Sequence, residues 1–215
     1  MRKSYLESLH DLKNEMLKMG SMVEDAIYKS IEALKNKDLT LAEQVIDDDD
    51  QIDDFETMLE EKCTKLIALQ QPVAIDLRTI IVISKLVTDL ERIGDYATNI
   101  AGMVLKIGDE PLIKPLIDIP RMTEIVTRRL RESLDAFVNQ DIKLAKQVAK
   151  EDEEIDVLDE QILRELITFM LEDPSRIRQA TYLMFISRFL ERIGDHSTNI
   201  CERVIYMVSG QREAY

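Results

Sequence analysis

The sequence predicts an all-α fold, organised as two tandem antiparallel three-helix bundles that are related by an internal repeat. An eleven-residue motif, Leu90–Ile100, returns as Leu190–Ile200, an offset of 100 residues. Apolar residues recur with the helical period through most of the chain. The composition agrees, because hydrophobic residues make up 45% and charged residues 33% of the 215, while only six glycines and five prolines occur. Such a mixture favours long helices over β-sheet.

Residues that interrupt helices mark three elements in each half. The first helix of each half ends at a polar break, Asn36-Lys37-Asp38 and its counterpart Asn139-Gln140-Asp141. The second helix ends near a proline, Pro72 or Pro174, because proline ends one helix and is tolerated at the start of another. We therefore expect helices at about 3–36, 38–70 and 73–107, then at about 121–138, 141–171 and 174–208.

Each predicted helix carries an apolar stripe that would face a bundle core. In the third helix the apolar positions alternate steps of four and three residues from Leu86 to Ile107, and Ile186 to Met207 repeats these steps. This seam is typical of long helices packed nearly parallel or antiparallel. Between the halves, segment 108–120 contains three prolines and cannot be one helix. The predicted domains are consequently residues 1–110 and 115–215.

The repeated motif places two carboxylates on one side of each third helix. Glu91 and Asp95 are four residues apart, as are Glu191 and Asp195. Like charges at this spacing repel by about 0.2–0.5 kcal/mol. The repetition of an unfavourable pair suggests that each half holds a cation against it.

Hairpin geometry brings further acidic residues to the same height. Asp53 and Glu91 lie equally far before and after Pro72 in the sequence, and so do Asp49 and Asp95. Positions equally far from the turn of an antiparallel hairpin lie level with each other. The sequence thus predicts a cluster of four carboxylates in the first half.

The second half gives the same result about Pro174. Asp156 and Glu191 lie at nearly equal distances before and after this proline, and the same holds for Asp152 and Asp195. Oxygen ligands alone suit hard cations such as Mg²⁺, Mn²⁺, Ca²⁺ or iron. The eight predicted metal ligands are Asp49, Asp53, Glu91, Asp95, Asp152, Asp156, Glu191 and Asp195.

Two other interpretations of these residues remain open. Acidic pairs on helices commonly face solvent, and Arg92, Arg192 or Arg78 would be able to neutralise the carboxylates as salt bridges. Gly94 and Gly194 lie inside the motifs, where glycine costs about 1 kcal/mol relative to alanine. Close approach of a neighbouring helix or a metal would explain both glycines. His196 replaces Tyr96 in the second motif and is a further candidate ligand.

The net charge indicates which partners the protein can bind, and the cysteines indicate its redox compartment. Forty-two acidic and 28 basic residues give a formal charge of −14, which repels phosphate backbones, so we expect no nucleic-acid binding. Cys63 and Cys201 lack metal-like spacing and indicate a reducing compartment. No apolar run approaches the roughly 20 residues needed to cross a bilayer, and no secretion signal precedes Tyr5. We expect a soluble, cytoplasmic protein.

At these residues the chain resembles a known family. Two copies of the motif Leu-Glu-Arg-Ile-Gly-Asp-x-x-Thr-Asn-Ile, each closing a three-helix repeat, are similar to the PhoU family of phosphate-transport regulators. The resemblance extends over essentially the whole chain, including the Met19-Gly20 break, the turn at Pro72 and the segment Asp76-Leu77-Arg78. Relatives match His196 in the second repeat, whereas the first repeat here has Tyr96.

The resemblance implies a function and a set of partners. It implies a non-enzymatic protein that represses the phosphate-starvation response by contacting a phosphate ABC transporter's ATPase and a sensor histidine kinase. It also implies that the eight acidic residues bind metal clusters, with iron, manganese, magnesium or zinc as candidates. We further expect a homodimer that reaches the membrane only through its partners.

Two alternatives from other classes are kept. A carboxylate-bridged di-metal enzyme in a helical bundle normally uses two Glu-x-x-His pairs, and this chain has only Glu7-x-x-His10. No Gly-rich nucleophile elbow is present for a hydrolase. A metal-free helical adaptor, in which the carboxylates bind only arginines, would be distinguished by its metal content.

Overall fold

The computed structural model describes residues 2–151 and 153–213, and this part of the chain consists of helices joined by turns and loops, without a β-strand. The first half consists of α1 (Arg2–Asn36), α2 (Leu39–Gln70) and α3 (Ile75–Ile107). The second half consists of α4 (Asp118–Asn139), α5 (Ile142–Lys150), α6 (Glu153–Glu172), the 3₁₀ turn η1 (Pro174–Arg176) and α7 (Ile177–Ser209). The predicted fold, two antiparallel three-helix bundles related by a repeat, is confirmed.

The aspartates of the two predicted breaks, Asp38 and Asp141, cap the N-termini of the helices that follow them. The Asp38 side chain accepts a hydrogen bond of 2.9 Å from the Leu41 amide at the start of α2. Asp141 does the same for α5, accepting from the amides of Lys143 and Leu144 at 2.9 and 3.1 Å. Each cap satisfies backbone donors that would otherwise lack a partner, a contribution of about 1 kcal/mol.

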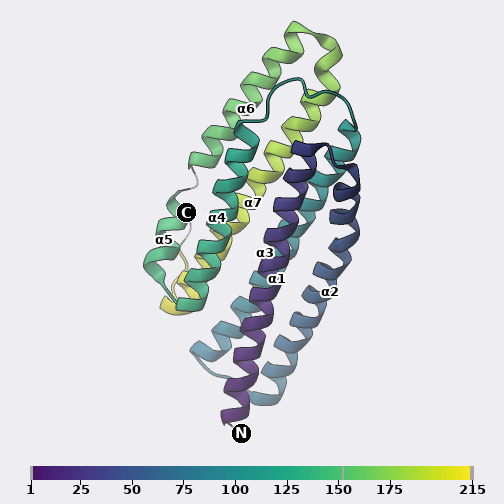
Figure 1. Ribbon diagram of the computed structural model, residues 1–215. Coiled ribbons are helices and arrows are strands. Elements are labelled where there is room, and N and C mark those ends of the chain that lie inside the picture. The colour runs from purple at the N-terminus through teal and green to yellow at the C-terminus, as the bar shows by residue number, and fades with distance from the viewer. Residues whose placement is uncertain (1, 152, 214–215) are drawn as a thin grey trace.

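The single helix predicted over 141–171 is wrong, because two helices, α5 and α6, occupy this segment (Figure 1). At the end of α5 the Glu151 amide donates to the Val148 carbonyl at 3.2 Å, which tightens the last turn. Helix α6 then begins with Glu153, Glu154 and Asp156 in its first turn. The positive end of the helix dipole stabilises acidic side chains there, an advantage that they lack within a continuous helix.

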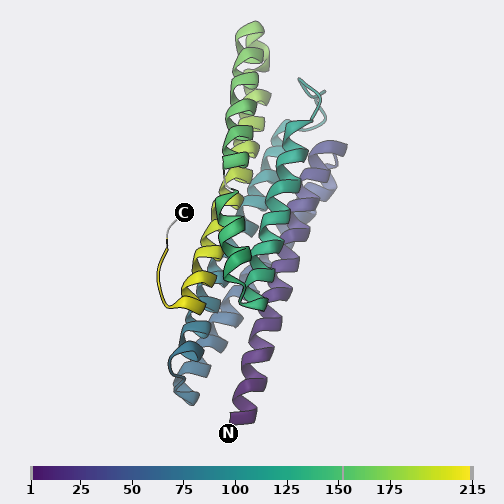
Figure 2. The ribbon, with the colours of Figure 1, turned by 90° about the vertical axis from the view of Figure 1, so that its left-hand side faces the viewer.

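Helices α3 and α7, which end the two repeats, lie side by side at the centre of the elongated molecule (Figures 1 and 2). Helices α1 and α2 pack on α3, helices α4, α5 and α6 pack on α7, and α1 also contacts α4. The α6–α7 hairpin projects beyond the other helices at one end, and the α2–α3 turn lies toward the opposite end. The predicted apolar seam, for example Leu86, Leu90 and Ile93, is fully buried in a core shared by both halves.

Among the described residues, no helix is long and apolar enough to span a membrane. The division into domains 1–110 and 115–215 stays a prediction, since α3 and α7 join the two repeats through one core.

Candidate carboxylate sites

The first motif places two acidic side chains and an arginine on one turn of α3. The Glu91 side chain is only 14% exposed, and Asp95 is half-buried. Arg92 lies beside both, with its Nη1 atom 2.8 Å from Asp95 Oδ2 and its Nε atom 3.3 Å from Glu91 Oε2. The second distance is not accompanied by hydrogen-bond geometry, so the buried Glu91 Oε2 atom lacks a hydrogen-bond partner.

Helix α2 brings its acidic residues toward this turn, as the hairpin geometry predicts. A Cβ atom at Gly94 would lie 3.1 Å from Ile52 Cδ1 and 3.5 Å from Asp49 Oδ1. Gly94 therefore permits the close approach of α2 that its position in the motif suggests. Asp49 is half-buried beside α3, whereas Asp53 is exposed.

Burial and acidic neighbours raise the pKa of two carboxyl groups in the first repeat, Glu91 and Asp49. Burial raises the pKa of Glu91 to about 7, and the negative charges of Asp95, Glu56 and Asp53 add to this against the opposing effect of Arg92. Burial also raises the pKa of Asp49, opposed by a hydrogen bond with the Thr98 side chain and supported by Asp53, Asp95 and Asp50. The charges of Asp53 and Asp95 therefore act on both Asp49 and Glu91, and the charge of Glu56, which sequence reasoning missed, acts on Glu91 as well.

These side chains are close without converging on a common point. Within residues 2–151 and 153–213, no group of three or more His, Cys, Asp or Glu side chains has the arrangement needed to hold a metal ion. The donor types suit a hard cation, and so does a buried carboxylate oxygen that accepts no hydrogen bond. Binding would require side-chain rotations that turn several of these oxygens toward one position.

The second motif is more strongly paired with arginine. Glu191 is 8% exposed, and its Oε1 atom accepts a hydrogen bond of 2.8 Å from Arg188 Nη1. Arg192 Nη1 lies 3.0 Å from Asp195 Oδ2. Burial and Asp195 raise the pKa of Glu191, whereas Arg188 and Arg192 oppose the shift and Asp159 supports it.

The α6 side of the second site is described only in part. Asp156 is exposed on α6, and the predicted ligand Asp152 lies outside the described residues. A Cβ atom added at Gly194 would lie 2.8 Å from Ile155 Cδ1 and 3.6 Å from Arg129 Nη1. Arg129, from α4, is fully buried and donates to Thr198 Oγ1 at 2.8 Å. No spacing along a single helix predicts a role for this arginine, but an alignment of the first helices of the two halves shows a charge in an otherwise apolar stripe.

Salt bridges with arginine, the alternative to a metal ion, therefore exist for carboxylates of both motifs. Arg92 and Arg192 contact the motif carboxylates as that interpretation predicts. Arg78 does not, because its Nε atom donates to the Met207 carbonyl at 3.2 Å and so attaches the start of α3 to the end of α7.

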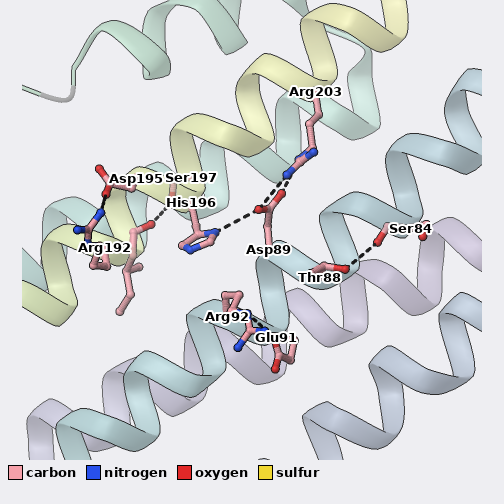
Figure 3. A network of polar contacts seen from close by, with 11 residues as sticks. Ser84, Thr88, Asp89, Glu91, Arg92, Arg192, Asp195, His196, Ser197 and Arg203 are labelled. Atoms are coloured by element: carbon pink, nitrogen blue, oxygen red, sulfur yellow. Dashed lines mark hydrogen bonds and ion pairs between the residues drawn. The ribbon is translucent and has the colours of Figure 1, made fainter. Parts of the chain in front are cut away.

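His196 contributes to the contact between the repeats and not to a carboxylate cluster (Figure 3). Its Nδ1 atom lies 3.1 Å from Oδ1 of the buried Asp89, on α3. Arg203 of α7 contacts the same carboxylate, with Nε 2.5 Å from Oδ2 and Nη2 3.2 Å from Oδ1. Tyr96 packs against the imidazole with a centroid distance of 5.8 Å. Asp89, two residues before Glu91, thereby joins the two central helices by a polar network that motif reasoning did not identify.

The fold and these motifs define a class of protein: a two-repeat helical bundle in which each repeat ends with a paired acidic motif. A family model described as PhoU domain matches residues 16–104 and again 119–204. The chain is 42% identical over 212 residues to the phosphate-specific transport system accessory protein PhoU homolog of Clostridium acetobutylicum, covering 98% of this chain and 97% of the relative. A protein of the same name from Aquifex aeolicus is 44% identical over 205 residues, covering 95% and 93%.

Solved structures give the same result. The crystal structure of PhoU from Pseudomonas aeruginosa superimposes with a TM-score of 0.92 at 39% identity, covering 96% of this chain and 100% of the other. The phosphate transport system regulatory protein PhoU from Streptococcus pneumoniae gives 0.91 at 31% identity, with 98% and 100% covered. The chain belongs to the PhoU family.

Proposed function

We propose that this protein is the accessory protein of a phosphate-specific transport system and that it represses the phosphate-starvation response when phosphate is plentiful. The names of its full-length relatives support the first part of this proposal. It acts in the cytoplasm, and its partners are the ATPase of the phosphate ABC transporter and a sensor histidine kinase. A homodimer is the form expected to meet them.

The protein acts by binding and not by catalysis. Its sequence contains two histidines, and His196 is occupied with Asp89 between the repeats, while His10 is exposed on α1. Neither motif offers the Glu-x-x-His pair on which di-metal bundle enzymes rely. The charge of −14 favours partners with basic surfaces and speeds their encounter.

A metal ion is proposed at the carboxylates of the first repeat, where Asp49, Asp53, Glu91 and Asp95 would hold it. The observation that carries this proposal is the buried Glu91 Oε2 atom, which accepts no hydrogen bond, has only the Arg92 guanidinium at 3.3 Å as an ion-pair partner among the described residues, and lies within reach of the charges of Asp95, Glu56 and Asp53. A bound cation would supply the positive charge that offsets their repulsion, and it would fix α2 against α3. Metal binding by Asp152, Asp156, Glu191 and Asp195 in the second repeat stays a prediction.

Deletion of the gene tests the regulatory role. In high phosphate the deletion strain should express a phosphate-starvation reporter that the parent strain keeps silent, and a plasmid copy should restore silence. Normal repression together with normal phosphate uptake in the deletion strain, with no second copy of the gene, would overturn the proposal.

A further inference from the structure

The projecting α6–α7 hairpin (Figures 1 and 2) exposes apolar side chains along a groove between its two helices. Leu163 and Ile167 of α6 are 37% and 42% exposed, and Phe185 of α7 is 48% exposed. The groove has a volume of about 310 Å³, and its lining consists of Asp159, Leu163, Thr181, Met184, Phe185, Ser187 and Arg188. An apolar surface of this kind is typical of a binding site.

The apolar surface continues toward the turn of the hairpin. Leu171 follows Leu163 and Ile167 at a step of four residues, which keeps it on the same side of α6. Ile177 precedes Phe185 on the same side of α7, at two such steps. Leu171 and Ile177 are exposed as well. Each helix of the hairpin therefore presents an exposed stripe, and the two stripes run side by side.

The two repeats can be compared residue by residue along their hairpins. Ile52 of α2 lies against the position of a Cβ atom at Gly94, and Ile155 of α6 lies in the same way against Gly194. These contacts fix which positions correspond, both between α2 and α6 and between α3 and α7. The comparison shows which exposed residues a hairpin of this fold needs and which it does not.

Three exposed positions are polar in the first repeat and apolar in the second. Their residues are Glu60, Thr64 and Lys85 in the first repeat, and Leu163, Ile167 and Phe185 in the second. The reverse occurs at Thr181, whose counterpart is Ile81. Since the first hairpin folds with polar residues at these three positions, folding does not require apolar ones there. A partner that covers them explains their presence in the second hairpin.

Neighbouring groups hold the groove in a fixed shape. The ring of Phe185 stacks on Phe189 at a centroid distance of 6.3 Å, and Phe189 stacks on Tyr96 of α3 at 6.0 Å. Ser187 Oγ donates to Asp159 Oδ1 at 2.6 Å at the other end of the groove. An aromatic ring that is already held in place loses little conformational freedom on binding, and such rings are frequent anchors of interfaces.

The charge of the hairpin determines which partner fits it. Residues 153–191 contain nine acidic and four basic side chains, and the whole chain has a formal charge of −14. Two copies of this protein would therefore repel each other at the groove. A helix with apolar residues on one face and Lys or Arg beside them complements both the groove and its charge.

We propose that the α6–α7 groove binds a basic amphipathic helix of a partner protein, whose apolar face lies on Leu163, Ile167 and Phe185. This inference rests on the proposed function, since the partner is the transporter ATPase or the sensor kinase named there, and it adds the surface that meets it. The bound helix packs against α6 and α7, as α4 does within the chain.

A synthetic peptide tests the groove on the purified full-length protein. The peptide is a helix of about 18 residues, with leucines on one face and lysines on the other, roughly 27 Å long. A peptide of the same composition with the leucines scrambled out of the helical period controls for attraction by charge alone. Fluorescence anisotropy of each labelled peptide gives its Kd, and the helical peptide should bind at least tenfold more tightly.

The test variant carries Leu163→Glu with Phe185→Lys, which introduces the residues of the first repeat and leaves the net charge unchanged. It should bind the helical peptide at least tenfold more weakly than the wild type. The matched control, Leu6→Glu with Tyr28→Lys, changes two exposed apolar residues of α1 to the same residue types and should keep the Kd within twofold. Circular dichroism checks folding, and Ile167→Thr is the milder variant if the double one does not fold, with a loss of at least threefold.

The same variants are then compared on the immobilised transporter ATPase and sensor kinase. The hairpin variant should lose binding to at least one of them, while the α1 variant retains it. Equal affinity of the wild type for the two peptides, or wild-type binding of the helical peptide or of both partners by the hairpin variant, would overturn the inference. A wild-type dimer that the hairpin variant converts to a monomer in analytical ultracentrifugation would also overturn it, because the groove would then join two copies. A wild-type protein that binds neither partner would refute the proposed function, and the peptide titration would still decide whether the groove takes a basic helix.

Discussion

Glu91→Gln should stabilise the metal-free protein, and the gain should grow as the pH rises. The carboxyl group has a pKa of about 7 in the folded protein against 4.5 for the ordinary side chain. A raised carboxyl pKa means that the folded state binds the proton more tightly than the unfolded state. This group therefore lowers the free energy of unfolding as the pH rises from about 4.5 to 7. Above that range the free energy of unfolding stays at its lower value.

The size of the effect follows from the same two values. A tenfold change in proton affinity corresponds to about 1.4 kcal/mol, so a pKa of about 7 in place of 4.5 gives about 3 kcal/mol as the upper limit. Solvent reaches part of the side chain and screens its charge, so we expect about 1–2 kcal/mol at pH 8. At pH 5, where the folded protein keeps the proton, the gain should fall below about 1 kcal/mol.

Thermal and urea unfolding of the chelator-treated protein at pH 5 and pH 8 measure this gain. For a chain of this size about 1–2 kcal/mol corresponds to a rise in Tm of roughly 2–8 °C. Glu43→Gln, an exposed residue of α2, is the matched control and should change stability by less than about 0.5 kcal/mol at either pH. A Glu91→Gln protein that is no more stable than the wild type at pH 8, or equally stabilised at both pH values, would refute the electrostatic reasoning.

Three further predictions concern packing, the contact between repeats, and partner binding. Gly102→Ala, where an added Cβ meets nothing within 4 Å, should stabilise α3 by about 0.5–1 kcal/mol. In contrast, Gly194→Ala should give no gain in stability, because its Cβ would lie 2.8 Å from Ile155 Cδ1 and overpacking costs about 1–3 kcal/mol. Urea denaturation compares the stability of the two variants with that of the wild type. An equal gain in both variants would contradict the packing described. Asp89→Asn should cost about 2 kcal/mol by the same assay, since it leaves Arg203 without its buried carboxylate, and an unchanged midpoint would show that this network is not stabilising. Association with a basic partner, followed by surface plasmon resonance, should slow as salt rises from about 0.1 M to 1 M, because the screening length falls from about 10 Å to about 3 Å; a salt-independent rate would exclude steering by the negative charge.

Local sequence signals were sufficient to predict most of the fold. The apolar seam from Leu86 to Ile107, the capping aspartates Asp38 and Asp141, and the two prolines act within a few residues of where they stand, so the pattern of helices followed directly from them. Equal distances from Pro72 paired Asp49 with Asp95 and Asp53 with Glu91, and the two carboxylates of each pair do act on each other electrostatically.

Features that depend on contacts between distant segments were not predictable in this way. The break between α5 and α6 has no counterpart in α2, although both segments contain four consecutive acidic residues. Arg129 reaches the second motif from α4, and Asp89 meets His196 and Arg203 only because α3 and α7 pack together. Charged groups at such positions are identified by tertiary packing and not by spacing along one helix.

The most direct test of the link between the carboxylates and the proposed function is complementation of the deletion strain. Plasmids would carry the wild-type gene, the Glu91→Gln and Asp95→Asn double variant, or Glu43→Gln, with protein amounts matched by immunoblot. Reporter expression from a phosphate-starvation gene would be measured in high phosphate. We predict that the wild type and Glu43→Gln restore repression while the double variant leaves the reporter on; full repression by the double variant would contradict a regulatory role for the first carboxylate site.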